Sequence, residues 1–295
     1  LKKTMVDEIK SASRALAAEL DVRGLMNIQF AVKDDTLYII EVNPRASRTV
    51  PFVSKATGIP WAKVATRVML GESLKKQGVT KEMIPEHISV KEAVFPFVKF
   101  PGVDVTLGPE MRSTGEVMGV DKDFGMAFIK SQLAAGVKLP SSGTVFMSVN
   151  DHDKPTAPDL ARQLVAMGFR IIATSGTLAL LKSHNIACDP VHKVGEGRPN
   201  VLDVIKNGDV HLIINTPFGK ATKLDETLIR STATARGIPI ITTMNGARAT
   251  VTGMQALRKR GLSVTPLQTY HEKSIGRETI KKFLTPLSVM SSSQS

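Results

Sequence analysis

A carboxylate, an amide and two guanidinium groups lie close together in the sequence near the amino end of the chain. They belong to Glu41, Asn43, Arg45 and Arg48, and they follow directly after an apolar segment. Carboxylate and amide oxygens are the ligands that hard divalent cations such as Mg²⁺ or Mn²⁺ prefer. Arginine side chains neutralise phosphate oxygens and the charge that develops on a transferred phosphoryl group. These residue types therefore point to a site for a divalent cation and a polyphosphate.

Two short strands joined by a tight turn are expected to position this site. Residues 25–32 and 37–43 have the apolar composition typical of strands, and the polar residues between them suit a turn. If residues 34–36 form the loop, Gln29 lies opposite Glu41. The predicted metal ligands are then Gln29, Glu41 and Asn43.

Strand periodicity also predicts which face of the hairpin carries these groups. Side chains alternate along a strand, so Glu41, Asn43 and Arg45 are expected on one side. Leu37 and Ile39 precede them in the same register and should make the rest of that face a buried one. The alternative interpretation is an edge hairpin whose polar end is simply solvated.

Composition bounds the class of protein. The chain has 295 residues, of which 42% are hydrophobic, which is enough for two domains with separate cores. The basic excess lies in the second half, where residues 136–295 hold 20 Lys and Arg against 11 Asp and Glu, compared with 19 against 16 in residues 1–135. The basic residues are scattered and only two tyrosines and one tryptophan are present, so we expect no nucleic-acid partner.

No apolar run approaches the roughly 20 residues needed to cross a bilayer, so no membrane association is expected. A single cysteine, Cys188, excludes an internal disulfide and fits a reducing compartment, either the cytoplasm or, in a plant, the plastid. We expect Cys188 to be a small buried strand residue. The chain begins at Leu1 rather than at a methionine, which suggests a fragment.

The periodicity of the chain changes after residues 139–143, which have the composition of a linker. Before the linker, helices are expected at residues 5–20, 60–70 and 123–133. After it, apolar strand-like runs at 144–149, 170–174, 211–216 and 239–243 alternate with helical runs at 157–167, 177–183, 200–206, 224–236 and 247–259. This alternation predicts a doubly wound α/β domain with a parallel sheet.

The carboxyl ends of these strands carry small polar residues. Residues 174–177, 215–216 and 242–246 each supply hydroxyls, amides or glycine at a strand-to-helix turn, where helix amide groups can hold a phosphate. Lys154 and Lys193 could add positive charge. For any single strand end an ordinary helix cap is the alternative. The histidines at 184, 192 and 211 form no convincing catalytic arrangement, which favours a ligand sensor.

The chain resembles the carboxyl-terminal part of the large subunit of glutamine-dependent carbamoyl phosphate synthetase. The resemblance covers residues 1 to about 271 and is strongest in three segments: NIQFAV at 27–32, EVNPRASRTVPFVSKATG at 41–58 and GPEMRSTGEVMG at 108–119. In this family two ATP-grasp units phosphorylate bicarbonate and then carbamate, and a methylglyoxal-synthase-like domain regulates them. The resemblance implies an α/β fold, with an α+β ATP-grasp remnant at 1–135, a doubly wound methylglyoxal-synthase-like domain at 136–273 and a disordered tail at 274–295.

The resemblance also implies roles for individual residues. Arg45 and Arg48 match phosphate-contacting arginines, and Gln29, Glu41 and Asn43 match metal ligands. Glu92 matches a position that contacts the activator ornithine, a structural ion pair being the alternative. The positions that match the site of a nucleotide effector are Lys154, Thr174, Thr177, Lys193 and Asn215. Pro217 replaces a hydroxyl residue of some members, so the resemblance does not identify the effector.

The activity implied is ATP-dependent phosphorylation of carbamate for pyrimidine and arginine biosynthesis, with Mg²⁺ or Mn²⁺ as cofactor. The implied partners are a glutamine amidotransferase small subunit, further copies in an oligomer of heterodimers, and the effectors UMP, IMP and ornithine. Because the family's upstream ATP-enclosing lid has no counterpart here, the chain alone is expected to be inactive. One alternative is an effector-binding and oligomerising module without catalysis. Methylglyoxal synthase activity is disfavoured, because the strand ends lack the carboxylate cluster that proton abstraction needs.

Overall fold

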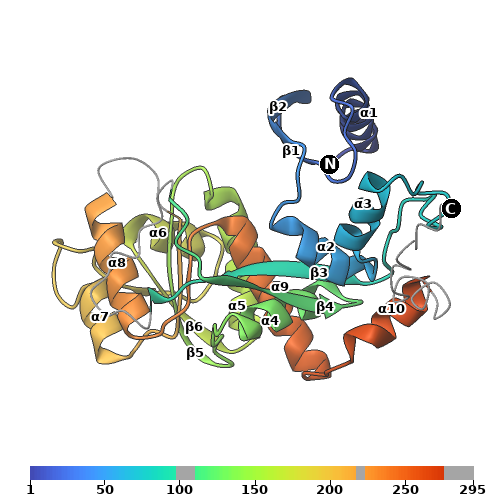
Figure 1. Ribbon diagram of the computed structural model, residues 1–295. Coiled ribbons are helices and arrows are strands. Elements are labelled where there is room, and N and C mark those ends of the chain that lie inside the picture. The colour runs from blue at the N-terminus through green and yellow to red at the C-terminus, as the bar shows by residue number, and fades with distance from the viewer. Residues whose placement is uncertain (98–109, 217–222, 276–295) are drawn as a thin grey trace, which may run out of the picture. The chain divides into compact units, whose positions relative to one another are not determined.

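The computed structural model describes residues 1–97, 110–216 and 223–275 (Figure 1). The chain forms two compact units: Leu1–Glu86 with the chain from Val264 onward, and His87–Ser263. Residues 87–97 and 110–135, which were expected to belong with the amino-terminal part, therefore pack with the second unit. The domain boundary expected from the sequence, between residues 135 and 136, stays a prediction.

The first unit is built from four helices and one hairpin within its described residues. They are α1 (Lys3–Glu19), β1 (Asn27–Lys33), β2 (Thr36–Asn43), α2 (Thr49–Thr57), α3 (Trp61–Met69) and α10 (Leu267–Ile275). Its buried apolar cluster is small and centres on Ile59 and Val64. In α10, His271 Nε2 donates to the Lys55 carbonyl oxygen of α2 at 2.6 Å. The helices expected at 5–20 and 60–70 are confirmed, and the predicted tail lies outside the described residues from 276 onward.

The β1–β2 hairpin turns more tightly than the sequence indicated. Its loop is only Asp34 and Asp35, whose φ values of 51° and 58° are left-handed, as in the type I′ turns that suit two-residue hairpins. A two-residue loop alone would place Gln29 opposite Ile40. Instead the register shifts by one residue between Gln29 and Phe30, which leaves Ile40 as a bulge and pairs Gln29 with Glu41.

The bulge also changes the faces of the hairpin. Directly paired residues share a face, and Phe30 pairs with Ile39 while the adjacent Gln29 pairs with Glu41. Glu41 therefore lies on the opposite face from Ile39. The expectation that both side chains lie on one face was wrong. The expected burial was wrong as well, since Ile39 is 51% exposed and Ile40 62% exposed. An unforeseen bulge reverses side-chain alternation beyond the point where it occurs.

The second unit begins with an antiparallel pair, β3 (Ile88–Val94) and β4 (Gly115–Asp121), covered on one face by α4 (Phe124–Ala134). Gly119 lets α4 approach the strand closely, because a Cβ at this position would collide with the Ala127 carbonyl oxygen. Asp123 begins α4 as its N-cap and accepts a hydrogen bond from the Met126 amide at 3.0 Å.

A five-stranded parallel sheet follows, in the order β7-β6-β5-β8-β9. Its elements are β5 (Gly143–Val149), η2 (Lys154–Thr156), α5 (Ala157–Ala166), β6 (Phe169–Ala173), α6 (Ser175–Ser183), β7 (Asp189–Pro190), α7 (Val201–Asn207), β8 (Leu212–Thr216), α8 (Lys223–Ala235), β9 (Ile240–Ile241) and α9 (Met244–Arg260). The doubly wound domain is thus confirmed. The order reverses direction at β5, which places a ligand-binding crevice between β5 and β8.

The central strands of this sheet alternate between two cores. Val145 and Met147 of β5 face the core formed with α5, α6 and α9, whereas Phe146 faces the core formed with α7 and α8. Ile129 of α4 belongs to the first of these cores, and Gly253 of α9 lies so close to it that an added Cβ would be 2.6 Å from Ile129 Cγ1. This packing of α4 on α9 explains why residues 87–97 and 110–135 belong to the second unit.

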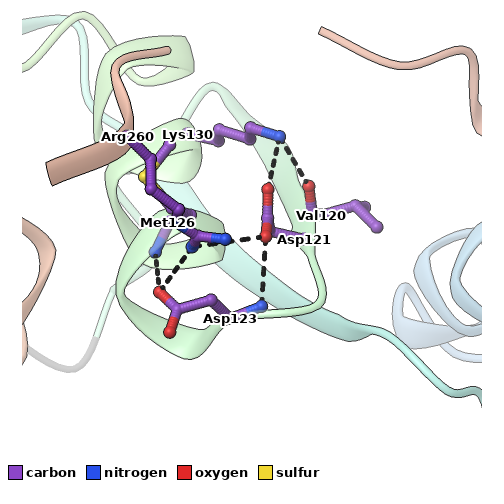
Figure 2. Close-up of polar contacts among 6 residues, drawn as sticks. All are labelled: Val120, Asp121, Asp123, Met126, Lys130 and Arg260. Atoms are coloured by element: carbon purple, nitrogen blue, oxygen red, sulfur yellow. Dashed lines mark hydrogen bonds and ion pairs between the residues drawn. The ribbon is translucent and has the colours of Figure 1, made fainter. Parts of the chain in front are cut away.

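Charged groups reinforce the junction of β4, α4 and α9 (Figure 2). Lys130 Nζ lies 2.8 Å from Asp121 Oδ2, and Arg260 Nη2, at the end of α9, lies 3.8 Å from Asp121 Oδ1 and 3.2 Å from Asp123 Oδ1. Burial alone would raise the pKa of Asp121, but Lys130 and Arg260 outweigh it and hold that pKa below its usual value.

Candidate functional site

The hairpin brings the three predicted metal ligands to one face of its open end. Gln29 pairs with Glu41 and Asn27 pairs with Asn43, so Glu41 and Asn43 project from the same side of β2. Asn43 Nδ2 donates to Glu41 Oε1 at 2.8 Å. One carboxylate and two amides offer the hard oxygen donors that Mg²⁺ or Mn²⁺ takes, and Gln29 and Glu41 are exposed to incoming ligands.

This donor set contains a single negative charge. No group of three or more His, Cys, Asp or Glu side chains suited to a metal ion occurs in residues 1–97, 110–216 and 223–275. A cation held by Glu41 with amide oxygens therefore needs further anionic ligands. The phosphates of a bound nucleotide are the usual source of such ligands for Mg²⁺.

The two arginines lie on the segment that connects β2 to α2. β2 ends at Asn43, and the Arg45 amide donates to the Asn43 carbonyl oxygen at 2.9 Å, which turns the chain. Arg45 therefore lies beyond the end of the strand. Contrary to expectation, strand alternation does not determine the side on which its side chain lies. Arg45 and Arg48 are exposed, and Arg48 is the N-cap residue of α2.

A cavity of about 480 Å³ opens at the carboxyl edge of the parallel sheet, where the strand order reverses. All five residues predicted for the effector site line it: Lys154, Thr174, Thr177, Lys193 and Asn215. Its apolar wall includes Phe146, Val194 and Ile229, so the cavity combines polar groups at the strand ends with a surface suited to a flat organic ring.

The polar end of the cavity lies at the start of α6. Thr174 is the N-cap residue of this helix, and the first helical amides are available to an anion at that point. Thr174 Oγ1 lies 3.0 Å from Ser148 Oγ, and Thr177 Oγ1 accepts a hydrogen bond from the Val149 amide at 3.1 Å. Thr174 and Thr177 are 5% and 2% exposed, so these hydroxyls are held in fixed positions.

Both lysines of the cavity are close to carboxylates. Lys154 Nζ lies 2.5 Å from Asp151 Oδ1, and Lys193 Nζ lies 3.7 Å from Glu196 Oε1. Lys154 extends over α6, because its Nζ would be 3.5 Å from a Cβ placed at Gly176. Gly176 thus leaves room for this ammonium beside the helix amides.

Sequence reasoning missed several residues of the cavity wall. They are Ser148, Asn150, Asp151, His152, Asp225 and Glu226. Three of them are carboxylates: Asp151 follows β5, and Asp225 and Glu226 belong to the first turn of α8. A signal for Asp151 existed, because it lies two residues after a predicted strand end. Asp225 and Glu226 gave none, since an acidic first turn is common in any helix.

One predicted strand end does not line the cavity. After β9, Thr243 Oγ1 accepts a hydrogen bond from the Gly246 amide at 3.1 Å and acts as the N-cap of α9. This end is the ordinary helix cap that was the alternative interpretation. Pro217, predicted to remove a hydroxyl from the site, lies outside the described residues.

Glu92 projects from β3 toward α4. Gln132 Nε2 donates to Glu92 Oε2 at 2.7 Å, so its structural partner is a neutral amide rather than the cation that an ion pair would need. Burial raises the pKa of Glu92, and the hydrogen bond from Gln132 only partly offsets this effect. A half-buried carboxylate in this state favours the approach of a cationic group.

Cys188 and the histidines, for which no catalytic role was predicted, have structural surroundings. Cys188 is partly buried and directly precedes β7 rather than lying within a strand, and burial raises the pKa of its thiol to about 11, which leaves it unreactive. His184 ends α6, and His211 Nδ1 accepts a hydrogen bond from the Thr144 amide at 3.2 Å.

Across the described ranges, no helix is both long and apolar enough to span a bilayer.

Comparison with known proteins links both sites to one family. Residues 1–77 match the model of the carbamoyl-phosphate synthase L chain ATP-binding domain, and residues 157–242 match the MGS-like domain. The carbamoyl phosphate synthase large chains of Rhodopirellula baltica and Archaeoglobus fulgidus are each 52% identical over 93% of this chain, which covers 26% of their length. That of Synechocystis is 53% identical over 92% of this chain and 25% of its own length.

The chain thus spans about a quarter of the length of the curated relatives it matches. Identity at this level extends over both units, including the hairpin and the sheet with its cavity. The chain belongs to the carbamoyl phosphate synthase large-chain family.

Proposed function

We propose that the complete protein containing this chain transfers the γ-phosphoryl group of ATP to carbamate and so forms carbamoyl phosphate. Gln29, Glu41 and Asn43 would hold Mg²⁺ or Mn²⁺, which neutralises charge on the nucleotide phosphates when bound. The observation that carries this proposal is the convergence of these three side chains at the open end of the β1–β2 hairpin.

The remaining residues of this segment act on the phosphoryl group. Arg45 and Arg48 are exposed directly after the metal-binding strand, where their guanidinium groups can stabilise the spread negative charge. Most of the catalysis in such a site comes from positioning and charge stabilisation. Glu41 would help to hold the cation beside the donor phosphates, and the arginines would neutralise the group in transfer.

We further propose that the cavity of the second unit binds a nucleoside monophosphate effector such as UMP or IMP. Lys154, Lys193 and the start of α6 would hold the phosphate, while Asn215 and the apolar wall would contact the nucleoside. The cavity volume and its two kinds of wall support this assignment. Glu92 would bind the ammonium group of ornithine, which its burial and neutral partner support.

The partners proposed for the complete protein are a glutamine amidotransferase small subunit and further copies in an oligomer of heterodimers. The proposed roles are pyrimidine and arginine biosynthesis, in the cytoplasm or, in a plant, the plastid. Family membership is what supports these assignments.

The catalytic proposal is tested by Glu41→Ala in the complete large chain. ATP formation from ADP and carbamoyl phosphate should be lost, because this back reaction uses the carbamate-phosphorylating site. Bicarbonate-dependent ATP hydrolysis should persist. Glu8→Ala, a substitution at an exposed position of α1, should leave both activities intact. Unchanged ATP formation in Glu41→Ala would overturn the assignment.

The alternative is that the chain serves only as an effector-binding and oligomerising module. Calorimetry of the 295-residue chain with UMP, IMP and ornithine separates the two proposals. Binding by this chain, combined with unimpaired catalysis by the Glu41→Ala large chain, would favour the alternative.

A further inference from the structure

The lysine at the polar end of the cavity is already paired with a carboxylate. Lys154 Nζ and Asp151 Oδ1 are 2.5 Å apart. The Lys154 side chain is 31% exposed, whereas that of Asp151 is 93% exposed. Asp151 therefore reaches the ammonium group from the solvent side, where it can move away without disturbing the fold.

Taken together, the charged side chains of the cavity wall do not favour an anion. The residues that line it include Lys154 and Lys193 but also the carboxylates Asp151, Asp225 and Glu226, of which Glu226 lies 3.9 Å from Arg230 Nη2. Lys193 is moreover 3.7 Å from Glu196. A phosphate group that binds both lysines must therefore compete with carboxylates that lie beside them.

We propose that Asp151 sets the affinity of the cavity for phosphate by competing with the ligand for the Lys154 ammonium group. This inference rests on the proposed effector function of the cavity. A phosphate oxygen at hydrogen-bond distance from Lys154 Nζ must displace the Asp151 carboxylate, or share the ammonium with it at the cost of repulsion between the two anions. Either way, part of the binding free energy is lost.

The competition lowers the affinity of every phosphate group that reaches Lys154 by a similar factor. Inorganic phosphate contacts only the polar end of the cavity, so the loss at Lys154 removes much of its affinity. A nucleoside monophosphate also buries its ring against apolar residues such as Val194 and Ile229, which adds affinity that the carboxylate does not oppose. Asp151 thus lowers the affinity of the cavity for both ligands, and the apolar wall is what favours the nucleotide over free phosphate.

The test is Asp151→Asn, which keeps the size of the side chain and removes its charge. Dissociation constants of the 295-residue chain for UMP and for inorganic phosphate are measured by calorimetry at fixed ionic strength. Exposed ion pairs are weak, so both ligands should bind roughly two- to fivefold more tightly than to the wild-type chain. A thermal unfolding midpoint near that of the wild type verifies that the fold is intact.

Asp159→Asn is the matched control. Asp159 is also exposed and pairs with a cation three residues away, Arg162, at 2.6 Å, but it does not line the cavity. Asp159→Asn changes the net charge by the same amount as Asp151→Asn. Because the change lies outside the cavity, the dissociation constants of Asp159→Asn should equal those of the wild type. Equal tightening in both variants would overturn the proposal, because the effect would then come from net charge.

The outcomes separate this inference from the function on which it rests. If the wild-type chain binds UMP and Asp151→Asn binds it no more tightly, the role of Asp151 is wrong and the effector site stands. If the wild-type chain binds neither UMP nor phosphate, both proposals fail together.

Discussion

Gln29 lies directly opposite Glu41 across the β1–β2 hairpin, although the two-residue turn by itself would pair Gln29 with Ile40. The bulge at Ile40 corrects the register by one residue at the point where the polar end of the hairpin begins. Bulges commonly re-aim side chains next to functional sites. The local irregularity of this hairpin is therefore what joins an amide from one strand to a carboxylate from the other.

Gly119 and Gly115 provide a matched pair of substitutions in one strand. An alanine Cβ at 119 would collide with the Ala127 carbonyl oxygen, whereas at 115 it would meet nothing within 4 Å. We expect Gly119→Ala to lower the free energy of unfolding by about 1–3 kcal/mol or more, and Gly115→Ala to change it little. Urea denaturation of the two variants measures this. Equal stability would show that α4 does not pack closely on β4.

Asp121 should make stability depend on pH at the acidic end. Its pKa is lowered in the folded state, because Lys130 and Arg260 outweigh the effect of burial, so its contribution is present above the unfolded pKa and lost as pH falls through the folded pKa. Asp121→Asn should cost roughly 1–3 kcal/mol at pH 7 and little near pH 2. Denaturation midpoints across this range test it, and a cost independent of pH would contradict the account.

Glu92 should make stability depend on pH in the opposite direction. Burial raises its pKa in the folded state, so its favourable contribution is present below the unfolded pKa and is lost as pH rises through the folded pKa. Glu92→Gln, which can keep a hydrogen bond to Gln132, should match the wild type near pH 4 and exceed its stability at pH 7. A variant that is less stable than the wild type at pH 7 would show that the charged carboxylate is stabilising.

Lys154 should dominate phosphate binding in the cavity despite its pairing with Asp151. A charge-assisted hydrogen bond to phosphate is worth more than an exposed ion pair, so Lys154→Ala should weaken UMP binding about 10- to 100-fold. Lys182→Ala, at an exposed position near the end of α6, provides the control and should have no effect. Calorimetry on the 295-residue chain gives both constants. Equal losses in the two variants would mean that the lysine acts only through net charge.

The parallel sheet could be predicted because its signals are local. Strands β5, β6, β8 and β9 are short apolar runs between helical segments, and strand ends in such sheets meet at one edge, so Thr174 and Asn215 could be placed together. The two-residue strand β7 escaped detection, since Asp189 and Pro190 are poor strand formers.

Other features depend on contacts that no local pattern encodes. The Ile40 bulge has no signature in the sequence, and the pairing of Gln29 with Glu41 was predicted from a longer loop that the hairpin does not have. The close packing of Ile129 against Gly253 joins residues more than 120 positions apart, so the assignment of α4 to the second unit could not be foreseen. Asp225 reaches the cavity only through the placement of α8.

The position of a bound metal ion tests the central claim most directly. The measurement is an anomalous difference map of crystals of the complete large chain grown with Mn²⁺ and ADP. We predict a manganese peak about 2.0–2.6 Å from a Glu41 carboxylate oxygen and from an amide oxygen of Asn43 or Gln29. A peak at the nucleotide phosphates that contacts none of these three side chains would contradict the account.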